Sequence, residues 1–167
     1  TFTGVALPGA ALQVAAHPLY DRCDPDLGGD ENPQGPASFL LAYEKYDGSI
    51  NDSDIAYRLV SSAGAPGPEG SLYAGIGFEQ RVAISKSCGS VGGGTEGWAL
   101  VYCETDYQQT AGQLLVSFVT RQGTLRDPVG PAMFGVLTAP TENLGKEWDV
   151  SSPTTHGAPE SVDACRL

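Results

Sequence analysis

The residues of this sequence that could do chemistry are most concentrated between positions 21 and 31. Five carboxylates occur there beside a single arginine, namely Asp21, Asp24, Asp26, Asp30 and Glu31. Carboxylate oxygens at this density are the hard ligands that Ca²⁺ collects, roughly six to eight at a time. The stretch beginning at Asp24 opens like an EF-hand loop but has Gly28 where that loop needs its fifth-position ligand. The sequence therefore favours a solvated acidic loop over residues 21–36, with a calcium site as the alternative.

The four cysteines, at positions 23, 88, 103 and 165, form an even set without a CxxC pair. Such a set favours disulfides over zinc and predicts an oxidising compartment, so we expect a secreted or cell-surface protein. Cys88 and Cys103 flank a glycine-rich turn, and a hairpin with a pairing sum of about 191 would place them opposite each other. This pairing leaves Cys23 for Cys165.

No catalytic residue is predicted. A nucleophilic enzyme needs a base within hydrogen-bond reach of its nucleophile, and the two histidines, His17 and His156, both look like surface residues. The chain has no G-x-S-x-G elbow. A secreted hydrolase that uses strand-borne carboxylates such as Glu44, Glu79 or Glu104 is kept as an alternative.

The net charge and the composition argue against some classes of function and structure. The 167 residues include nine Lys and Arg against twenty Asp and Glu, a net charge of −11, which would repel phosphate backbones and argues against nucleic-acid binding. No apolar run reaches the ~18 residues that indicate a membrane span. The 22 glycines and 12 prolines favour short strands and turns over long helices.

The apolar residues follow a two-residue period in short runs, which predicts strands. These runs cover residues 39–44, 55–59, 72–76, 82–88, 98–103, 114–119 and 133–137. Residues 98–103 are apolar on both faces, as in a central strand, and Gly135 predicts a bulge or a close backbone contact. We therefore expect one all-β domain over residues 1–167, an antiparallel β-sandwich (jelly-roll or Ig-like) or a small barrel. Residues 138–167 are expected to form a long irregular tail packed on it.

Three further features bear on function. Residues 1–7 alternate like a strand, with Thr1, Phe2, Val5 and Leu7 as candidate contacts, and could pair in their own sheet or be donated to a neighbouring subunit. Trp148, an apolar ring in a polar tail, is a second candidate for partner binding. Asn51 begins an N-x-S sequon in a turn-like segment and is a candidate glycosylation site.

These features lead to a non-enzymatic extracellular binding or structural protein as the first hypothesis. It would act through protein–protein contacts or self-association, as a surface, fibre or adhesion subunit. The alternative is a secreted carbohydrate-binding, lectin-like module that uses surface Tyr and Trp. No cofactor is expected apart from the calcium alternative.

Overall fold

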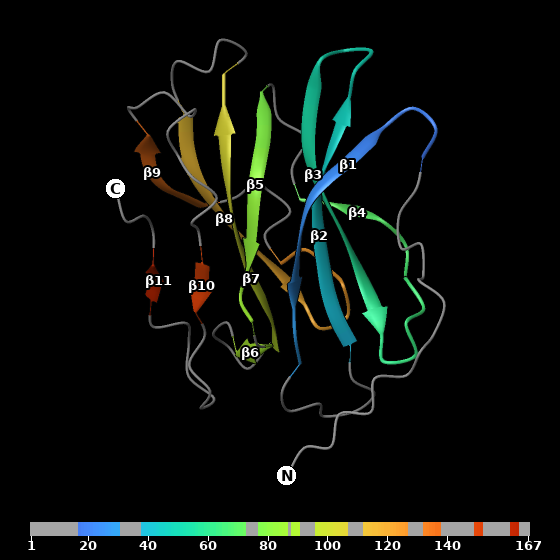
Figure 1. Cartoon of the computed structure of the whole chain (residues 1–167). Coiled ribbons are helices and arrows are strands. Elements are labelled where there is room, and N and C mark those ends of the chain that lie inside the picture. Colours follow the sequence, from blue (N-terminus) through green and yellow to red (C-terminus); the bar gives the residue numbers. More distant parts are fainter. Residues whose placement is uncertain are drawn as a thin grey trace.

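A computed structural model of the chain describes residues 17–30, 38–72, 77–86, 88–90, 96–106, 112–126, 132–137, 149–151 and 161–163. These residues form strands and turns and contain no helix (Figure 1). The strands are β1 (Asp21–Gly28), β2 (Ser38–Asp47), β3 (Asp52–Ser61), β4 (Gly70–Ser71), β5 (Phe78–Ile84), β6 (Gly89–Ser90), β7 (Glu96–Thr105), β8 (Gly112–Thr120), β9 (Ala132–Leu137), β10 (Asp149–Ser151) and β11 (Ser161–Asp163). The all-β prediction is therefore confirmed for the described part of the chain. None of these residues belongs to a helix that could cross a bilayer.

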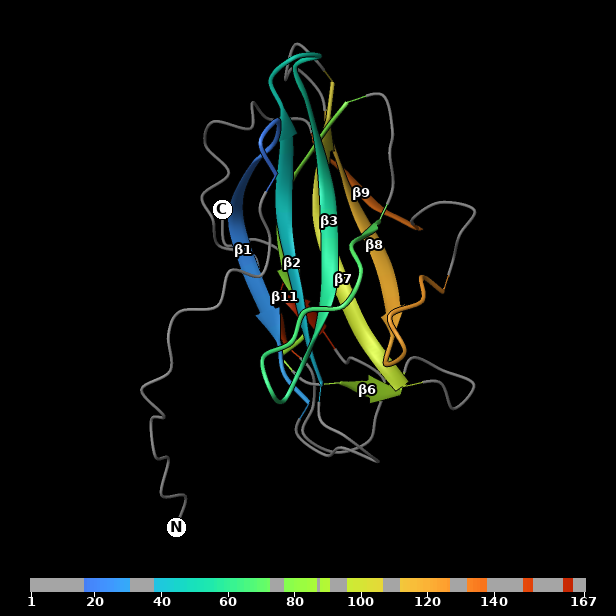
Figure 2. The same ribbon diagram turned by 90° about the vertical axis from the view of Figure 1, so that its right-hand side faces the viewer.

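One open, mixed sheet contains most of the strands, in the order β1-β2-β3-β5-β7-β8-β9, with β4 beside β3 and β6 beside β7. The expected wholly antiparallel sheet is wrong at one place, because β3 and β5 run parallel and share a single paired position, Ser53 with Phe78. Figure 2 shows β1, β2 and β3 following one another across the view, with β7 and β8 beyond them. The parallel junction thus divides the sheet into a β1–β3 part and a β5–β9 part.

The β2–β3 hairpin follows the sequence prediction. Its ten-residue strands pair from Ser38 with Ser61 to Asp47 with Asp52. Asp47 caps the turn by accepting hydrogen bonds from the amide and hydroxyl of Ser49 at 2.9 and 2.6 Å. Asn51 has a φ of 54°, a left-handed conformation that asparagine tolerates. Asn51 is exposed in this turn, and its glycosylation stays a prediction.

The predicted acidic loop is wrong over its first half, because residues 21–28 form the edge strand β1. Side chains along most of β1 alternate between exposed and partly buried positions. They do not alternate between polar and apolar residue types, so the hydrophobic periodicity does not predict a strand here. This segment forms a strand because it pairs with β2, from Asp21 opposite Tyr46 to Gly28 opposite Leu40. Pro25 is tolerated because it lies in an edge strand at a bulge.

The core consists of two clusters of buried residues. Its main cluster draws on β2, β3, β5, β7 and β8 and contains Leu40, Ala42, Ile55, Tyr57, Leu72, Val82, Ile84, Trp98, Leu100, Tyr102, Leu115 and Val119. A second cluster of Ala83, Ala99, Val101 and Leu114 lies on the other face of β7. β7 is therefore buried on both faces, as predicted for a central strand. The bulge predicted at Gly135 is also confirmed, since the β8–β9 register shifts there.

The structure does not form the predicted disulfide between Cys88 and Cys103, which are both free thiols. Gly89 pairs with Gly97 and Ser90 with Glu96, so the pairing sum places Cys88 beside Trp98. Cys88 packs against the main core cluster, whereas Cys103, next to Tyr102 along β7, points to the opposite face. Cys23 is also free, and its predicted partner Cys165 lies outside the described residues.

Part of the C-terminal segment that was expected to be irregular forms an antiparallel strand pair. β10 pairs with β11 from Asp149 opposite Asp163 to Ser151 opposite Ser161, and β10 contacts β5 and β7. Several candidate contacts of the sequence analysis lie outside the described residues, namely Thr1, Phe2, Val5, Leu7 and Trp148.

Candidate functional site

Two bulges face each other where β1 comes against β5. The register of β1 shifts between Cys23 and Asp26, and that of β5 shifts between Gln80 and Ala83. Each bulge contains a residue with left-handed backbone, Asp24 with a φ of 44° and Arg81 with a φ of 59°. Aspartate is among the residues that adopt this conformation more readily, but for a long side chain such as arginine it is uncommon.

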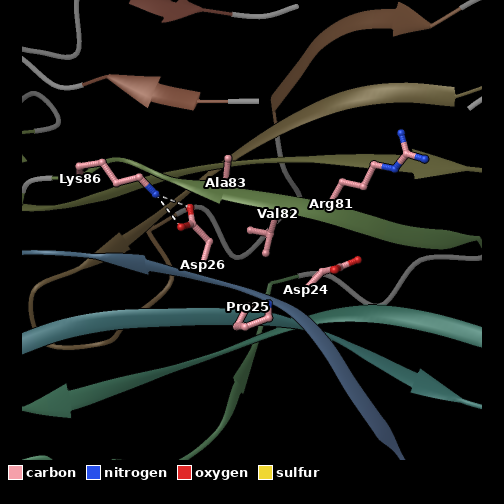
Figure 3. Close-up of a pocket in the computed structure, with 7 residues that line it drawn as sticks. All are labelled: Asp24, Pro25, Asp26, Arg81, Val82, Ala83 and Lys86. Atoms are coloured by element: carbon pink, nitrogen blue, oxygen red, sulfur yellow. Dashed lines mark hydrogen bonds and ion pairs between the residues drawn. The ribbon is translucent and has the colours of Figure 1, made fainter. Parts of the chain in front are cut away.

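The bulges enclose a pocket of about 350 Å³. It is lined by Asp24, Pro25 and Asp26 from β1 and by Arg81, Val82, Ala83 and Lys86 from β5 and the residues after it. Figure 3 shows Asp26 and Lys86 at one end of this cleft and Asp24 and Arg81 at the other. We call it the β1–β5 cleft. Each end therefore offers a cation and a carboxylate above a floor that includes Val82 and Ala83.

Side-chain carboxylates hold the two walls of the cleft together. Glu44 Oε1 accepts a hydrogen bond from the Arg81 amide at 2.6 Å, and Asp26 Oδ2 accepts one from the Ile84 amide at 2.7 Å. Asp26 also binds the Lys86 ammonium at 2.5 and 2.7 Å. Hydrogen bonds to a charged acceptor are among the stronger ones in proteins. The strained backbone at Arg81 is thus fixed by a buried carboxylate from β2.

Direct backbone contact between β1 and β5 follows at the end of the cleft. The Gly29 amide donates to the Lys86 carbonyl at 3.2 Å. The Gly29 carbonyl in turn accepts from Nε1 of the fully buried Trp98 at 2.7 Å. A Cβ added at Gly28 would lie 2.6 Å from Ile84 Cγ2, so only glycine permits this approach. The core therefore fixes one end of the cleft.

A thiol and two carboxylates meet at the other end. The ligand atoms of Cys23, Asp24 and Glu44 all lie within 4.8 Å of one another. Burial, followed by the charges of Glu44 and Asp24, raises the pKa of Cys23 to about 11, so the thiol is protonated and donates to Glu44 Oε2 at 3.8 Å. A metal held here would have to displace that proton. As it stands, the group is a protonated thiol beside two carboxylates at the β1 bulge.

A second charged cluster lies on the outer face of β1–β3, around Glu69. Its Oε2 accepts from Arg22 at 3.0 Å, Arg58 at 3.1 Å and the Tyr43 hydroxyl at 2.7 Å, and Lys45 lies 3.8 Å from Oε1. Burial alone would raise the pKa of Glu69, but these hydrogen bonds outweigh it and lower the pKa to about 2. Glu69 thus stays charged at any physiological pH.

The structure separates the carboxylates that the sequence suggested for calcium. Asp26 pairs with Lys86, and Asp30, whose side chain is 2% exposed, pairs with Arg121 at 2.7 Å. Asp21 is exposed on β1, and Glu31 lies outside the described residues. Of the five, Asp24 and Asp26 line the cleft. Calcium binding stays a prediction.

The strand-borne carboxylates of the hydrolase alternative do not share an open site. Glu79 is 0% exposed and Glu44 is buried. Glu104 accepts a hydrogen bond from the Gln113 side-chain amide.

Arg81, Lys86 and Glu69 are the site residues that sequence reasoning missed. Lys86 lies in the run predicted as a strand over residues 82–88 and Arg81 directly precedes that run, and no local pattern marks a bulge there. Glu69 lies in a Gly/Pro-rich connector, where a single acidic residue is expected to be solvated. A signal was present only at Pro25, since proline within a strand pairing indicates an edge or a bulge.

The fold and this cleft define an all-β protein with an open mixed sheet and a bulge-lined pocket of mixed charge. Comparison with family models, with curated proteins and with solved structures finds no match to the chain.

Proposed function

We propose that this chain is a non-enzymatic extracellular binding protein that acts through protein–protein contacts, as a surface, fibre or adhesion subunit. The β1–β5 cleft is its contact site, and the partner is a second copy of the chain. The contact of β1 with β5 favours a small barrel over a sandwich as the finer architecture.

The observation that carries this proposal is the position of the backbone strain. Asn51, the third non-glycine residue with positive φ among the described residues, lies in a hairpin turn, where that conformation is ordinary. Asp24 and Arg81 lie in strands and face the same pocket. Such conformations cost about 1–3 kcal/mol each and persist where surrounding contacts fix them, which is typical of binding sites.

The charges of the cleft favour a polypeptide partner. The chain as a whole carries −11, so it repels polyanions, yet the cleft offers Arg81 and Lys86 beside Asp24 and Asp26. A polypeptide presents donors and acceptors together and can satisfy both kinds of group. Mixed, paired charges of this type give an interface its orientation more than its affinity.

The test is self-association of the full chain by sedimentation velocity across the micromolar range. We expect concentration-dependent association that is weakened by Lys86→Glu in the cleft. Lys45→Glu is the matched control, because Lys45 is also paired with a carboxylate but lies in the Glu69 cluster on the outer face of β1–β3. A wild-type chain that stays monomeric throughout, or two variants that behave alike, would contradict the proposal.

A further inference from the structure

The backbone of β1 is strained at the peptide bond that joins Asp24 to Pro25. Asp24 has a φ of 44°, in the left-handed region, where residues other than glycine are uncommon. Aspartate enters this region more readily than most residues, but here the next residue is proline. The proline ring restricts the residue before it to extended backbone, with a φ of about −120°. The conformation of Asp24 is therefore strained by its neighbour as well as by its own side chain.

The surrounding structure holds this conformation in place. The residues on either side of the bulge, Cys23 and Asp26, both pair with β2. A side-chain oxygen of Asp24 also lies within 4.8 Å of the Cys23 sulfur and of a carboxylate oxygen of Glu44. A strained conformation persists where its surroundings determine it in this way. Breaking the bond between Asp24 and Pro25 would release the strain.

An aspartate followed by a proline forms the peptide bond that is hydrolysed most readily in acid. A carboxylate oxygen of the aspartate attacks the carbonyl carbon of its own residue and closes a five-membered anhydride ring. The C–N bond breaks, and the proline nitrogen leaves with a proton taken from the solvent. Water then opens the anhydride to two carboxyl groups. The net reaction is hydrolysis, and water is the only co-reactant.

Both residues of this bond are accessible to water. Asp24 is partly exposed and Pro25 is exposed, and both line the β1–β5 cleft on its β1 side (Figure 3). We infer that the chain cleaves its own backbone between Asp24 and Pro25 and that the strain of the bulge accelerates the reaction. This inference goes beyond the proposed function, because it requires no partner.

Cleavage at this bond would change the β1–β5 cleft. It would divide β1 at the bulge and so interrupt one wall of the cleft. The new ends are an amine at Pro25 and a second carboxyl group at Asp24, so the cut adds one group of each charge to the cleft. Residues 21–24 would then be held only by their own contacts, such as the pairing of Asp21 to Cys23 with β2.

The experiment compares this bond in the folded chain and in a peptide that cannot fold. The full chain and a synthetic peptide of residues 21–28 are incubated in the same mildly acidic buffer, at a pH where Glu69 stays charged. Fluorescence of the buried Trp98 checks that the chain remains folded, and mass spectrometry follows the fragments that end at Asp24. We expect cleavage to be about tenfold faster in the folded chain. A tenfold change corresponds to about 1.4 kcal/mol, which lies within the range that such backbone conformations store.

An Asp24→Asn variant of the full chain is the control for the chemistry. Asparagine also tolerates the left-handed conformation, so the variant should fold, but it lacks the attacking carboxylate and should not be cut at this bond. Cleavage of the folded wild type at the rate of the peptide, or more slowly, would show that the bulge does not accelerate the reaction. Cleavage of Asp24→Asn at the wild-type rate would show that an outside protease makes the cut. Either result would overturn the inference without bearing on self-association.

Discussion

Replacing Glu69 by glutamine should weaken the protein in a way that depends on pH. The substitution keeps the shape of the side chain but removes the charge that Arg22, Arg58 and Tyr43 share. The pKa of Glu69 falls from the ordinary 4.5 to about 2, and one pKa unit is worth about 1.4 kcal/mol, which sets an upper limit of roughly 3 kcal/mol. Because the side chain is 24% exposed and solvent screens the charges, we expect about 1–2 kcal/mol at pH 7.

The sign of the pH dependence follows from the lowered pKa. A carboxyl group that is more acidic in the folded state contributes stability above its unfolded pKa, and that stability is lost as the pH falls. For Glu69 the loss should occur between about pH 4.5 and pH 2. In Glu69→Gln this contribution is already absent, so the difference between the two proteins should shrink toward zero over that interval.

Urea unfolding followed by tryptophan fluorescence, which reports on the buried Trp98, measures both quantities. Glu96→Gln is the control, since Glu96 also pairs with an arginine, Arg121 at 3.0 Å, but its side chain is 41% exposed. That change should alter stability by less than about 0.5 kcal/mol. Wild-type stability in Glu69→Gln at pH 7, or parallel curves for the two proteins between pH 5 and pH 2.5, would refute the reasoning.

Three other predictions test separate parts of the structure. Burial first, and then the charge of Asp52, raises the pKa of Asp54, although the charge of Lys45 and the interaction with Glu79 oppose this and Asp47 adds to it. Stability should therefore fall as the pH rises through that raised pKa, and Asp54→Asn should flatten the fall in urea titrations; an unchanged slope would count against the raised pKa of Asp54. Gly28→Ala should lower the free energy of unfolding by about 1–3 kcal/mol through overpacking, because the new Cβ would lie 2.7 Å from Trp98 Cδ1. In the control Gly48→Ala the atom nearest to the new Cβ is 3.6 Å away, so the melting temperature should be nearly unchanged. Equal melting shifts in the two variants would contradict the close approach at Gly28. Alkylation and mass mapping of the native, unreduced chain should find no peptide that links Cys88 to Cys103, and recovery of that link would overturn the β6–β7 register.

Elements whose order is encoded locally could be predicted from the sequence. In the β2–β3 hairpin the two-residue period of Phe39, Leu41 and Tyr43 and the turn residues between Asp47 and Asp52 both indicated strands, although the main core cluster is formed by the alternate residues Leu40 and Ala42. β7 was recognisable because apolar residues on both of its faces require cover on both sides. In both elements the signal lies within the strand itself and its adjoining turn.

Elements whose order comes from distant partners could not be predicted. β1 has mostly polar side chains and becomes a strand through β2, and its Asp26 meets Ile84 across a separation of 58 residues. The conformation of Arg81 depends on Glu44, 37 residues earlier in the chain. The prediction of a disulfide between Cys88 and Cys103 was wrong for a related reason. Spacing along the sequence does not determine the register in which two strands pair.

The β1–β5 cleft and the parallel junction between β3 and β5 have the same structural origin. A mixed sheet that reverses direction at Ser53 and Phe78 leaves β5 without a continuous neighbour on one side. Glu44 and Asp26 accept the hydrogen bonds of the Arg81 and Ile84 amides on that side, where a paired strand would place its carbonyls. Asp26, one of the acidic side chains that make β1 look like a loop in the sequence, thus satisfies the backbone of β5.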